Sequence, residues 1–167
     1  NYDDNATEED GSCIPEVFGC TDPAAGNFDA SANTDDGTCD YGPWVEINIT
    51  ECNMTILLPD YADITVQGEA VNEAWIGATN GDGVVVGSVF WTANVTTSIA
   101  VWGEYNGIPG MSAGETINWI ISTDNGDING LATYSFGAGT YSCNGLSGIS
   151  SIDFGCTDSD EDGVCDE

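Results

Sequence analysis

The chain of 167 residues contains no Lys, no Arg and no His, against 29 Asp and Glu residues, so its formal charge is −29. Binding to nucleic acids and to anionic membrane surfaces depends on cationic side chains that neutralise phosphates. The absence of such side chains excludes both kinds of partner, and it also excludes ion pairs between side chains. We therefore expect divalent cations or high salt to offset the repulsion among the carboxylates.

The missing residue types also exclude most catalytic machinery. A chain without His, Lys or Arg cannot form a Ser-His-Asp triad, a Cys-His pair, a Schiff-base lysine or a phosphate clamp. Paired carboxylates, as in glycosidases, are the option that is left. Nothing in the sequence selects one pair among its many acids, so we expect that the protein is not an enzyme.

Long apolar segments are absent as well: the longest apolar runs have the length of strands, and we expect no membrane insertion. Seven Cys in a chain without His predict an extracellular disulfide framework, with a zinc site as the alternative. Because the number of Cys is odd, one of them must stay free or find a partner outside this segment. The candidate disulfide residues are Cys20, Cys39, Cys52, Cys143, Cys156 and Cys165.

The acids are unevenly distributed, with 11 in residues 1–42, 12 in 43–153 and 6 in 154–167. The middle segment is rich in β-branched and aromatic residues, in short runs separated by turn signals such as Asn-Gly, which is typical of strands. We therefore expect an all-β fold, with an antiparallel, immunoglobulin-like β-sandwich over 43–153 between small segments ordered by disulfides and calcium. The expected strands are 44–49, 54–58, 64–67, 74–79, 84–92, 98–102, 117–122, 132–136 and 141–143.

A repeat with an offset of 26 residues occupies the first segment, since residues 1–13 align without gaps on 27–39. The motif Phe-Gly-Cys-Thr-Asp at 18–22 also recurs at 154–158. Self-similarity of this kind is typical of a modular array. By this logic Cys20 pairs with Cys39 within one unit and Cys13 pairs outside the segment. Cys52 and Cys143 would join the two ends of the central domain.

Oxygen-bearing side chains at alternate positions, followed by a Gly that permits a tight turn, predict calcium binding in three stretches. The strongest is 158–166, which has the ligand spacing of an EF-hand loop without the flanking helices. The alternative is an acidic, disordered linker. The expected ligands are Asn1, Asp3, Asn5, Glu9, Asp10, Asn27, Asp29, Asn33, Asp35, Asp36, Asp158, Asp160, Asp162, Val164 and Asp166.

Residues 19–39 resemble the short Gly-Cys-x-Asp-Pro…Asp-Asp-Gly-Ser-Cys repeats of very large secreted proteins from marine bacteria and some algae. The tail is similar to thrombospondin type 3 repeats, in which Asp-x-Asp-x-Asp-Gly segments bind calcium. The segments 75–77, 99–103 and 113–120 look like a β domain that accompanies those repeats. The resemblance implies an extracellular location, and neighbouring copies or further repeats of the same protein as partners.

The sequence therefore predicts an extracellular, calcium-stabilised structural or adhesive module, a repeating unit of a surface fibre or filament. The alternative is a carbohydrate-binding module with surface glycans as partners, because five Trp offer flat faces to sugars, although Trp residues within strands usually pack in a core. A third hypothesis is an acidic protein adapted to high salt, with no specific metal. Four Asn-x-Ser/Thr sequons are candidate glycosylation sites: Asn5, Asn48, Asn53 and Asn94.

Overall fold

The structure is a computed structural model that describes residues 14–155 except 24 and 45. The chain divides into two compact units, with the boundary between Tyr41 and Gly42. The described residues form strands, turns and loops, which confirms the predicted all-β class. No helix in this part of the chain is long and apolar enough to cross a membrane.

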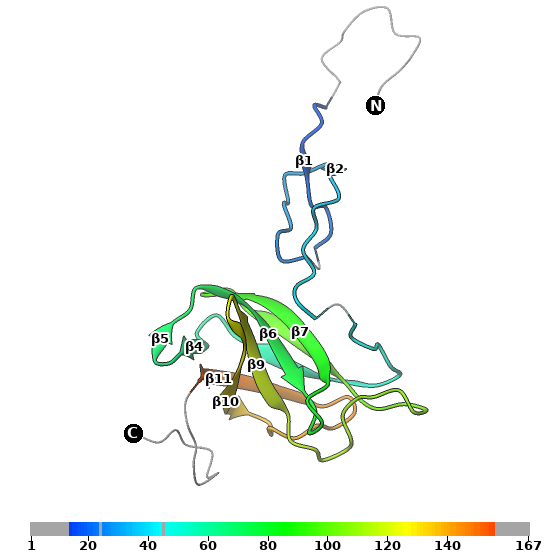
Figure 1. The fold of residues 1–167 in the computed structure, drawn as a ribbon, viewed down its shortest axis with the longest axis vertical. Helices are drawn as coiled ribbons and strands as arrows, with labels where there is room; N and C mark the ends of the chain where they lie inside the picture. The colour runs from blue at the N-terminus through cyan, green and yellow to red at the C-terminus, as the bar shows by residue number, and fades with distance from the viewer. Residues whose placement is uncertain (1–13, 24, 45, 156–167) are drawn as a thin grey trace, which may run out of the picture. The chain divides into compact units, whose positions relative to one another are not determined.

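In the described part of the first unit there are two short strands, β1 (Phe18–Gly19) and β2 (Thr34–Asp35), which pair in parallel (Figure 1). Cys20 and Ala25 are the buried apolar residues among the described residues of this unit. The predicted Cys20–Cys39 disulfide is confirmed, with the two Cα atoms 4.8 Å apart. Because a unit of this size buries too little apolar surface to be stable by itself, the covalent link must supply much of its order.

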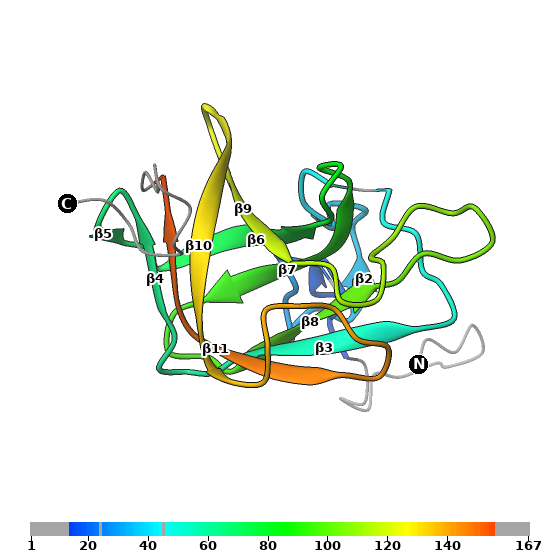
Figure 2. The ribbon, with the colours of Figure 1, turned by 90° about the horizontal axis from the view of Figure 1, so that it is seen from below.

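The described residues of the second unit form nine strands in one sheet (Figures 1 and 2). Along the sheet the order is β5-β4-β11-β10-β9-β6-β7, and β3 pairs with both β11 and β8. Their bounds are β3 (Asn53–Leu58), β4 (Asp63–Val66), β5 (Glu69–Ala70), β6 (Glu73–Thr79), β7 (Val85–Thr92), β8 (Thr97–Trp102), β9 (Asn118–Thr123), β10 (Gly126–Phe136) and β11 (Leu146–Phe154).

The sheet curls around one hydrophobic core. Along β3, buried residues alternate with half-buried ones, because successive side chains of a strand point to opposite faces. Trp119 from β9 and Ile152 and Phe154 from β11 are among the large side chains in this core. The predicted Cys52–Cys143 disulfide is confirmed, with Cα atoms 5.5 Å apart, and it joins the residue before β3 to the segment that precedes β11.

The sheet is mixed, which corrects the expectation of a purely antiparallel arrangement. β11 pairs in parallel with β3 through its first residues and with β4 through its last residues. β3 and β4 therefore follow one another in the same direction along one edge of β11, joined by the short connection 59–62. Alternation along a strand predicts which face is buried, but it carries no information on the direction of the neighbouring strand. The immunoglobulin-like sandwich stays a prediction.

Some of the expected strand positions are also corrected. The described residues of 44–49 and those of 141–143 form no strand, whereas the unexpected β11 pairs with three strands, β3, β4 and β10. Its segment is rich in Ser and Gly and was not among the expected strands. Ser147 is nevertheless fully buried, and its Oγ donates to the carbonyl of Ala138 (2.8 Å) and accepts from the Ala138 N–H (3.0 Å). A buried hydroxyl with satisfied hydrogen bonds is compatible with a core strand.

Candidate functional site

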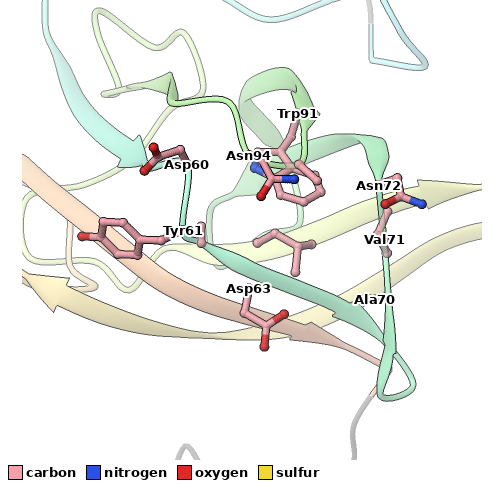
Figure 3. A pocket seen from close by; sticks show the side chains of 11 residues that line it. Asp60, Tyr61, Asp63, Ala70, Val71, Asn72, Trp91 and Asn94 are labelled. Atoms are coloured by element: carbon pink, nitrogen blue, oxygen red, sulfur yellow. The ribbon is translucent and has the colours of Figure 1, made fainter.

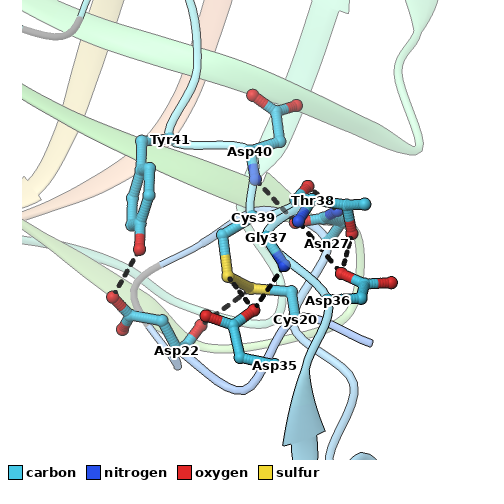
Figure 4. Close-up of a disulfide and its surroundings, with 10 residues drawn as sticks. All are labelled: Cys20, Asp22, Asn27, Asp35, Asp36, Gly37, Thr38, Cys39, Asp40 and Tyr41. Carbon is cyan, nitrogen blue, oxygen red and sulfur yellow. Dashed lines mark hydrogen bonds between the residues drawn. A yellow bond between two sulfur atoms is a disulfide. The ribbon is translucent and has the colours of Figure 1, made fainter. Parts of the chain in front are cut away.

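The carboxylates of the first unit that were expected to bind calcium hold the backbone of its loops. Asp29, Asp35 and Asp36 each accept, with Oδ1, a hydrogen bond of 2.8–3.0 Å from the N–H two residues further along the chain. This is the local turn that Asp favours. Beside the disulfide, the Tyr41 hydroxyl donates to Asp22 Oδ2 (2.8 Å), and this hydrogen bond raises the pKa of Tyr41 (Figure 4).

Two asparagines among the expected calcium ligands, Asn27 and Asn33, connect segments that are distant in sequence. Asn27 Oδ1 accepts from the Asp40 N–H (2.8 Å), and Asn27 Nδ2 donates to the Thr38 carbonyl (2.7 Å), as Figure 4 shows. Asn33 bonds in the same way to the backbone of the segment 15–17. The polar side chains that suggested a cation site therefore stabilise a unit that has almost no apolar core.

Within the described part of the chain, no three His, Cys, Asp or Glu side chains gather where they could hold a metal ion. Calcium also takes amide and carbonyl oxygens among its six to eight ligands, so calcium binding by Asn27, Asp29, Asn33, Asp35 and Asp36 stays a prediction. The remaining expected ligands lie outside the described residues, and calcium binding by them stays a prediction. These ligands are Asn1, Asp3, Asn5, Glu9, Asp10, Asp158, Asp160, Asp162, Val164 and Asp166. The candidate disulfide residues Cys156 and Cys165 also lie outside the described residues.

Hydroxyl groups stabilise the charged form of two of these carboxylates. The Ser31 hydroxyl donates to Asp29 Oδ1 (2.6 Å), and the Thr38 hydroxyl donates to Asp36 Oδ1 (2.5 Å). Together with the backbone N–H of the same residues, these bonds lower the pKa of both carboxyl groups below the ordinary value.

We expect these two turns to weaken in acid. Because the pKa of Asp29 and of Asp36 is lowered by folding, the stabilisation is complete above the ordinary value of 3.8 and is lost as the pH falls through the lowered values. An NMR titration of the Ser31 and Thr38 amides and of the two carboxyl carbons measures this. A Ser31→Ala variant should raise the pKa of Asp29 and leave that of Asp36 unchanged. Unchanged titration of Asp29 in this variant would contradict the assignment.

The three sequon residues in the described part of the chain differ in their surroundings. Asn94 is exposed in the turn between β7 and β8, in a left-handed backbone conformation with φ of 62°. Asn48 is exposed in the loop before β3, whereas Asn53 is half-buried at the start of β3, opposite Trp102. Asn5 lies outside the described residues. Glycosylation stays a prediction, and the exposure of Asn48 and Asn94 makes these two the better acceptors.

A pocket of about 310 Å³ opens in the second unit where the loop after β3, the β4–β5 hairpin and the end of β7 meet (Figure 3). Its wall includes the buried side chains of Ala62, Ile64 and Trp91 and the half-buried Val71. Its volume is at the lower end of the range for small-molecule sites. The exposed polar residues around it are Asp60, Tyr61, Asp63, Asn72 and Asn94.

Two hydrogen bonds join the segments that line this pocket. The Ala93 N–H donates to the Asn72 carbonyl (2.7 Å), which links the end of β7 to the start of β6. The Asp60 N–H donates to Thr96 Oγ1 (3.0 Å), which links the loop after β3 to the turn after β7. Sequence reasoning did not group these residues into one site, because they extend from Asp60 to Asn94 in the sequence and only the curl of the sheet brings them together.

No protein family model, no curated protein and no solved structure matches this chain. The assignment of a function therefore depends on the chemistry of the residues described above.

Proposed function

We propose that this chain is an extracellular structural or adhesive module, a repeating unit of a surface fibre or filament that calcium stabilises. The observation that carries the proposal is the construction of the first unit. It is closed by the Cys20–Cys39 disulfide and ordered by side-chain hydrogen bonds, with two buried apolar residues among those described. Small units of this type are stable where disulfides persist, which is outside the cytosol.

In this proposal the second unit is the larger, rigid element of the module. Its core and its own disulfide, Cys52–Cys143, give it stability that does not depend on the first unit. The expected immunoglobulin-like character belongs to the same proposal, with two halves of the curled sheet facing each other across the core. A module with two separately closed units can be repeated along a chain without a change in either unit.

Calcium has a physical role because 29 acids face no cationic side chain. The self-repulsion of such a chain destabilises every compact state, and it also keeps neighbouring copies apart. The segment 158–166 has the densest ligand pattern in the sequence, and we propose that calcium binds there. Bound divalent cations would neutralise part of the charge and allow copies or repeats of the module to approach one another.

Thermal unfolding of the oxidised protein in calcium and in excess chelator, at constant ionic strength, tests this proposal. We expect a higher midpoint in calcium, because a ligand that binds the folded state preferentially stabilises it. Each kcal/mol gained should raise the midpoint by about 2–4 °C for a chain of this size. An Asp160→Asn/Asp162→Asn variant should lose most of the gain, whereas Asp124→Asn, on an exposed turn of the second unit, should keep it.

Two outcomes would contradict the proposal. Equal midpoints in calcium and chelator would remove calcium from the mechanism, and full substitution of calcium by sodium would support the high-salt hypothesis instead. Assembly is measured separately, by electron microscopy and light scattering at increasing protein concentration. Ordered polymers that form in calcium support the structural function, and a monomer under all conditions opposes it.

A further inference from the structure

The outer face of the curled sheet carries its charge unevenly. Where β4, β10 and the end of β11 form the sheet, acids occupy positions that alternate with buried ones, as Asp63, Asp127 and Asp153 do. In contrast, β3, β8 and the residues 146–152 of β11 contain no acid at all. In a chain with 29 acids, these adjacent strands form a part of the surface from which carboxylates are absent.

The register of the strands arranges the outward side chains of this part in three rows. Alternate residues of the same strands, such as Ile56 and Ile99, are buried in the core, so the rows point away from it. Figure 2 shows β3 beside the first part of β11. We call the three rows the neutral face; they consist of Phe136, Gly148, Leu57 and Ser98, then Leu146, Thr55 and Ala100, and then Asn53 and Trp102.

The neutral face is open to solvent in the described part of the chain. Leu146 is 58% exposed and Phe136 is 44% exposed, although both are large apolar residues. The Phe136 ring lies over Gly148, where a Cβ atom would overlap it. Exposed apolar side chains that lie together on a sheet face are typical of an interaction surface.

The apolar outer face of β6 and β7 provides a comparison, because the chain covers it with its own residues. Trp75 of β6 packs against Phe90 of β7, with ring centroids 5.4 Å apart. Gly42 lies against the Trp75 ring, and Trp44 lies against Gly77. The Trp44 Nε1 also donates to Asp127 Oδ2 (2.9 Å). The described residues thus cover one apolar part of the outer face and leave the neutral face open.

The charge of the molecule restricts what can cover the neutral face. A chain with a charge of −29 repels an anionic partner, and it attracts a cationic partner to its acidic surfaces instead. The centre of a protein interface is depleted of charged residues and contains aromatic side chains, as this face does. A second copy of the chain offers the same uncharged rows, so two such faces can approach each other without bringing carboxylates together.

We propose that the neutral face is a contact between two copies of this chain, which pack face to face about a twofold axis. In such a contact the same surface is used by both partners. The side chains of the two faces interdigitate between sheets that are about 10 Å apart. The inference rests on the proposed function, in which copies of the module lie next to one another, and it names a surface through which they meet.

The size of the neutral face predicts a weak contact. Three rows across four strands extend about 15 Å in each direction. This is less than a standard interface, which buries about 800 Å² per partner, so we expect a dissociation constant of about 0.1 mM. Such an affinity is sufficient in a fibre, because linked neighbouring modules have an effective concentration in the millimolar range.

Sedimentation equilibrium of the oxidised full chain tests the proposal. The solution contains excess chelator and about 1 M sodium chloride, at which the Debye length is about 3 Å and the repulsion between copies is screened. Free thiols are alkylated first, so that any dimer is non-covalent. We expect a reversible dimer whose fraction rises with protein concentration and falls at low salt. In NMR spectra over the same concentrations, the amide shifts should concentrate in β3, β8 and 146–148.

Two variants place a carboxylate in the neutral face. Leu146→Asp should raise the dissociation constant at least about tenfold, because like charges oppose docking and a twofold contact contains the new charge twice. Ser98→Asp adds the same charge without the loss of an apolar side chain, and it keeps the test valid if Leu146→Asp folds poorly. Asn125→Asp is the matched control, because it adds one charge at an exposed turn next to the opposite end of β10, so the dimer should persist.

Three results would overturn the proposal. A monomer at all concentrations and both salt levels would exclude a second copy as the partner of the neutral face. Amide shifts in other strands would place the contact on another surface, and so would equal weakening by Asn125→Asp and Leu146→Asp. Because calcium is absent from this experiment, failure of the contact is distinct from failure of the calcium-dependent stability and assembly, which thermal unfolding and electron microscopy in calcium measure.

Discussion

Removal of the Cys52–Cys143 disulfide is expected to lower the free energy of unfolding of the second unit by about 4–5 kcal/mol in the chain-entropy model. The bridge spans 91 positions in sequence, and it connects the start of β3 to the segment that leads into β11. Without it, the unfolded chain gains the freedom of a very long loop, and the parallel β3–β11 pair must form without a covalent link. Urea unfolding of a Cys52→Ala/Cys143→Ala variant, followed by Trp fluorescence, measures the change.

The matched control is the other disulfide. A Cys20→Ala/Cys39→Ala variant removes a bridge of 19 positions in the first unit, for which the same model predicts a smaller loss of about 3 kcal/mol. This loss should appear in the first unit and leave the urea midpoint of the second unchanged, because the two units are separately compact. A shift of the second unit's midpoint in this control, or no shift in the Cys52/Cys143 variant, would contradict the division of the chain into two covalently closed units.

Substitution of Gly87 by Ala is expected to destabilise the second unit by about 3 kcal/mol, at the upper end of the range for overpacked cores. Gly87 lies in β7, and a Cβ atom at this position would overlap the carbonyl oxygen of Ala100 in β8. The obstacle is backbone, which cannot rotate away as a side chain can. β7 and β8 would have to separate where they cross, so the substitution tests the closure of the curled sheet directly.

Ser88→Thr is the control for this substitution, because it adds one methyl group to the next residue of the same strand, which points to the opposite face. Ser88 is half-buried, and the added methyl suits a β-strand, so a change within about 0.5 kcal/mol is expected. Urea unfolding and the dispersion of amide NMR signals compare the two variants. If Gly87→Ala were as stable as Ser88→Thr, the close approach of β7 and β8 would be wrong.

Most individual strands of the second unit were predictable from the sequence. The runs that became β3, β4, β6, β7, β8 and β9 have the β-branched and aromatic residues that strands favour, and their predicted bounds lie within a residue or so of the observed ones. The exceptions have local causes. Asn129-Gly130 predicted a turn, yet both residues lie within β10, where Gly130 is opposite Phe154 and a Cβ would overlap its ring. A Gly can thus mark the close approach of a large side chain instead of a turn.

The role of the polar residues in the first unit was only partly predictable. The alternation of oxygen ligands from Asn27 to Asp36 suggested calcium, and the structure shows each of these side chains in a hydrogen bond to the backbone. Asp and Asn are suited to both roles, because the same oxygen can accept from an N–H or coordinate a cation. Spacing alone does not distinguish the two roles, since a tight turn and a calcium loop have similar local geometry.

The sequence by itself determined the properties that depend on residue type: the charge of −29, the all-β class, and the two disulfide pairings found among the described residues. The tertiary structure decided which segments meet. It placed the Ser- and Gly-rich β11 between strands of both directions, and it brought Asp60, Asn72 and Trp91 around one pocket. The physical reason is that burial alternates locally along each strand, whereas the pairing of strands and the closure of the sheet arise from packing between residues that are distant in sequence.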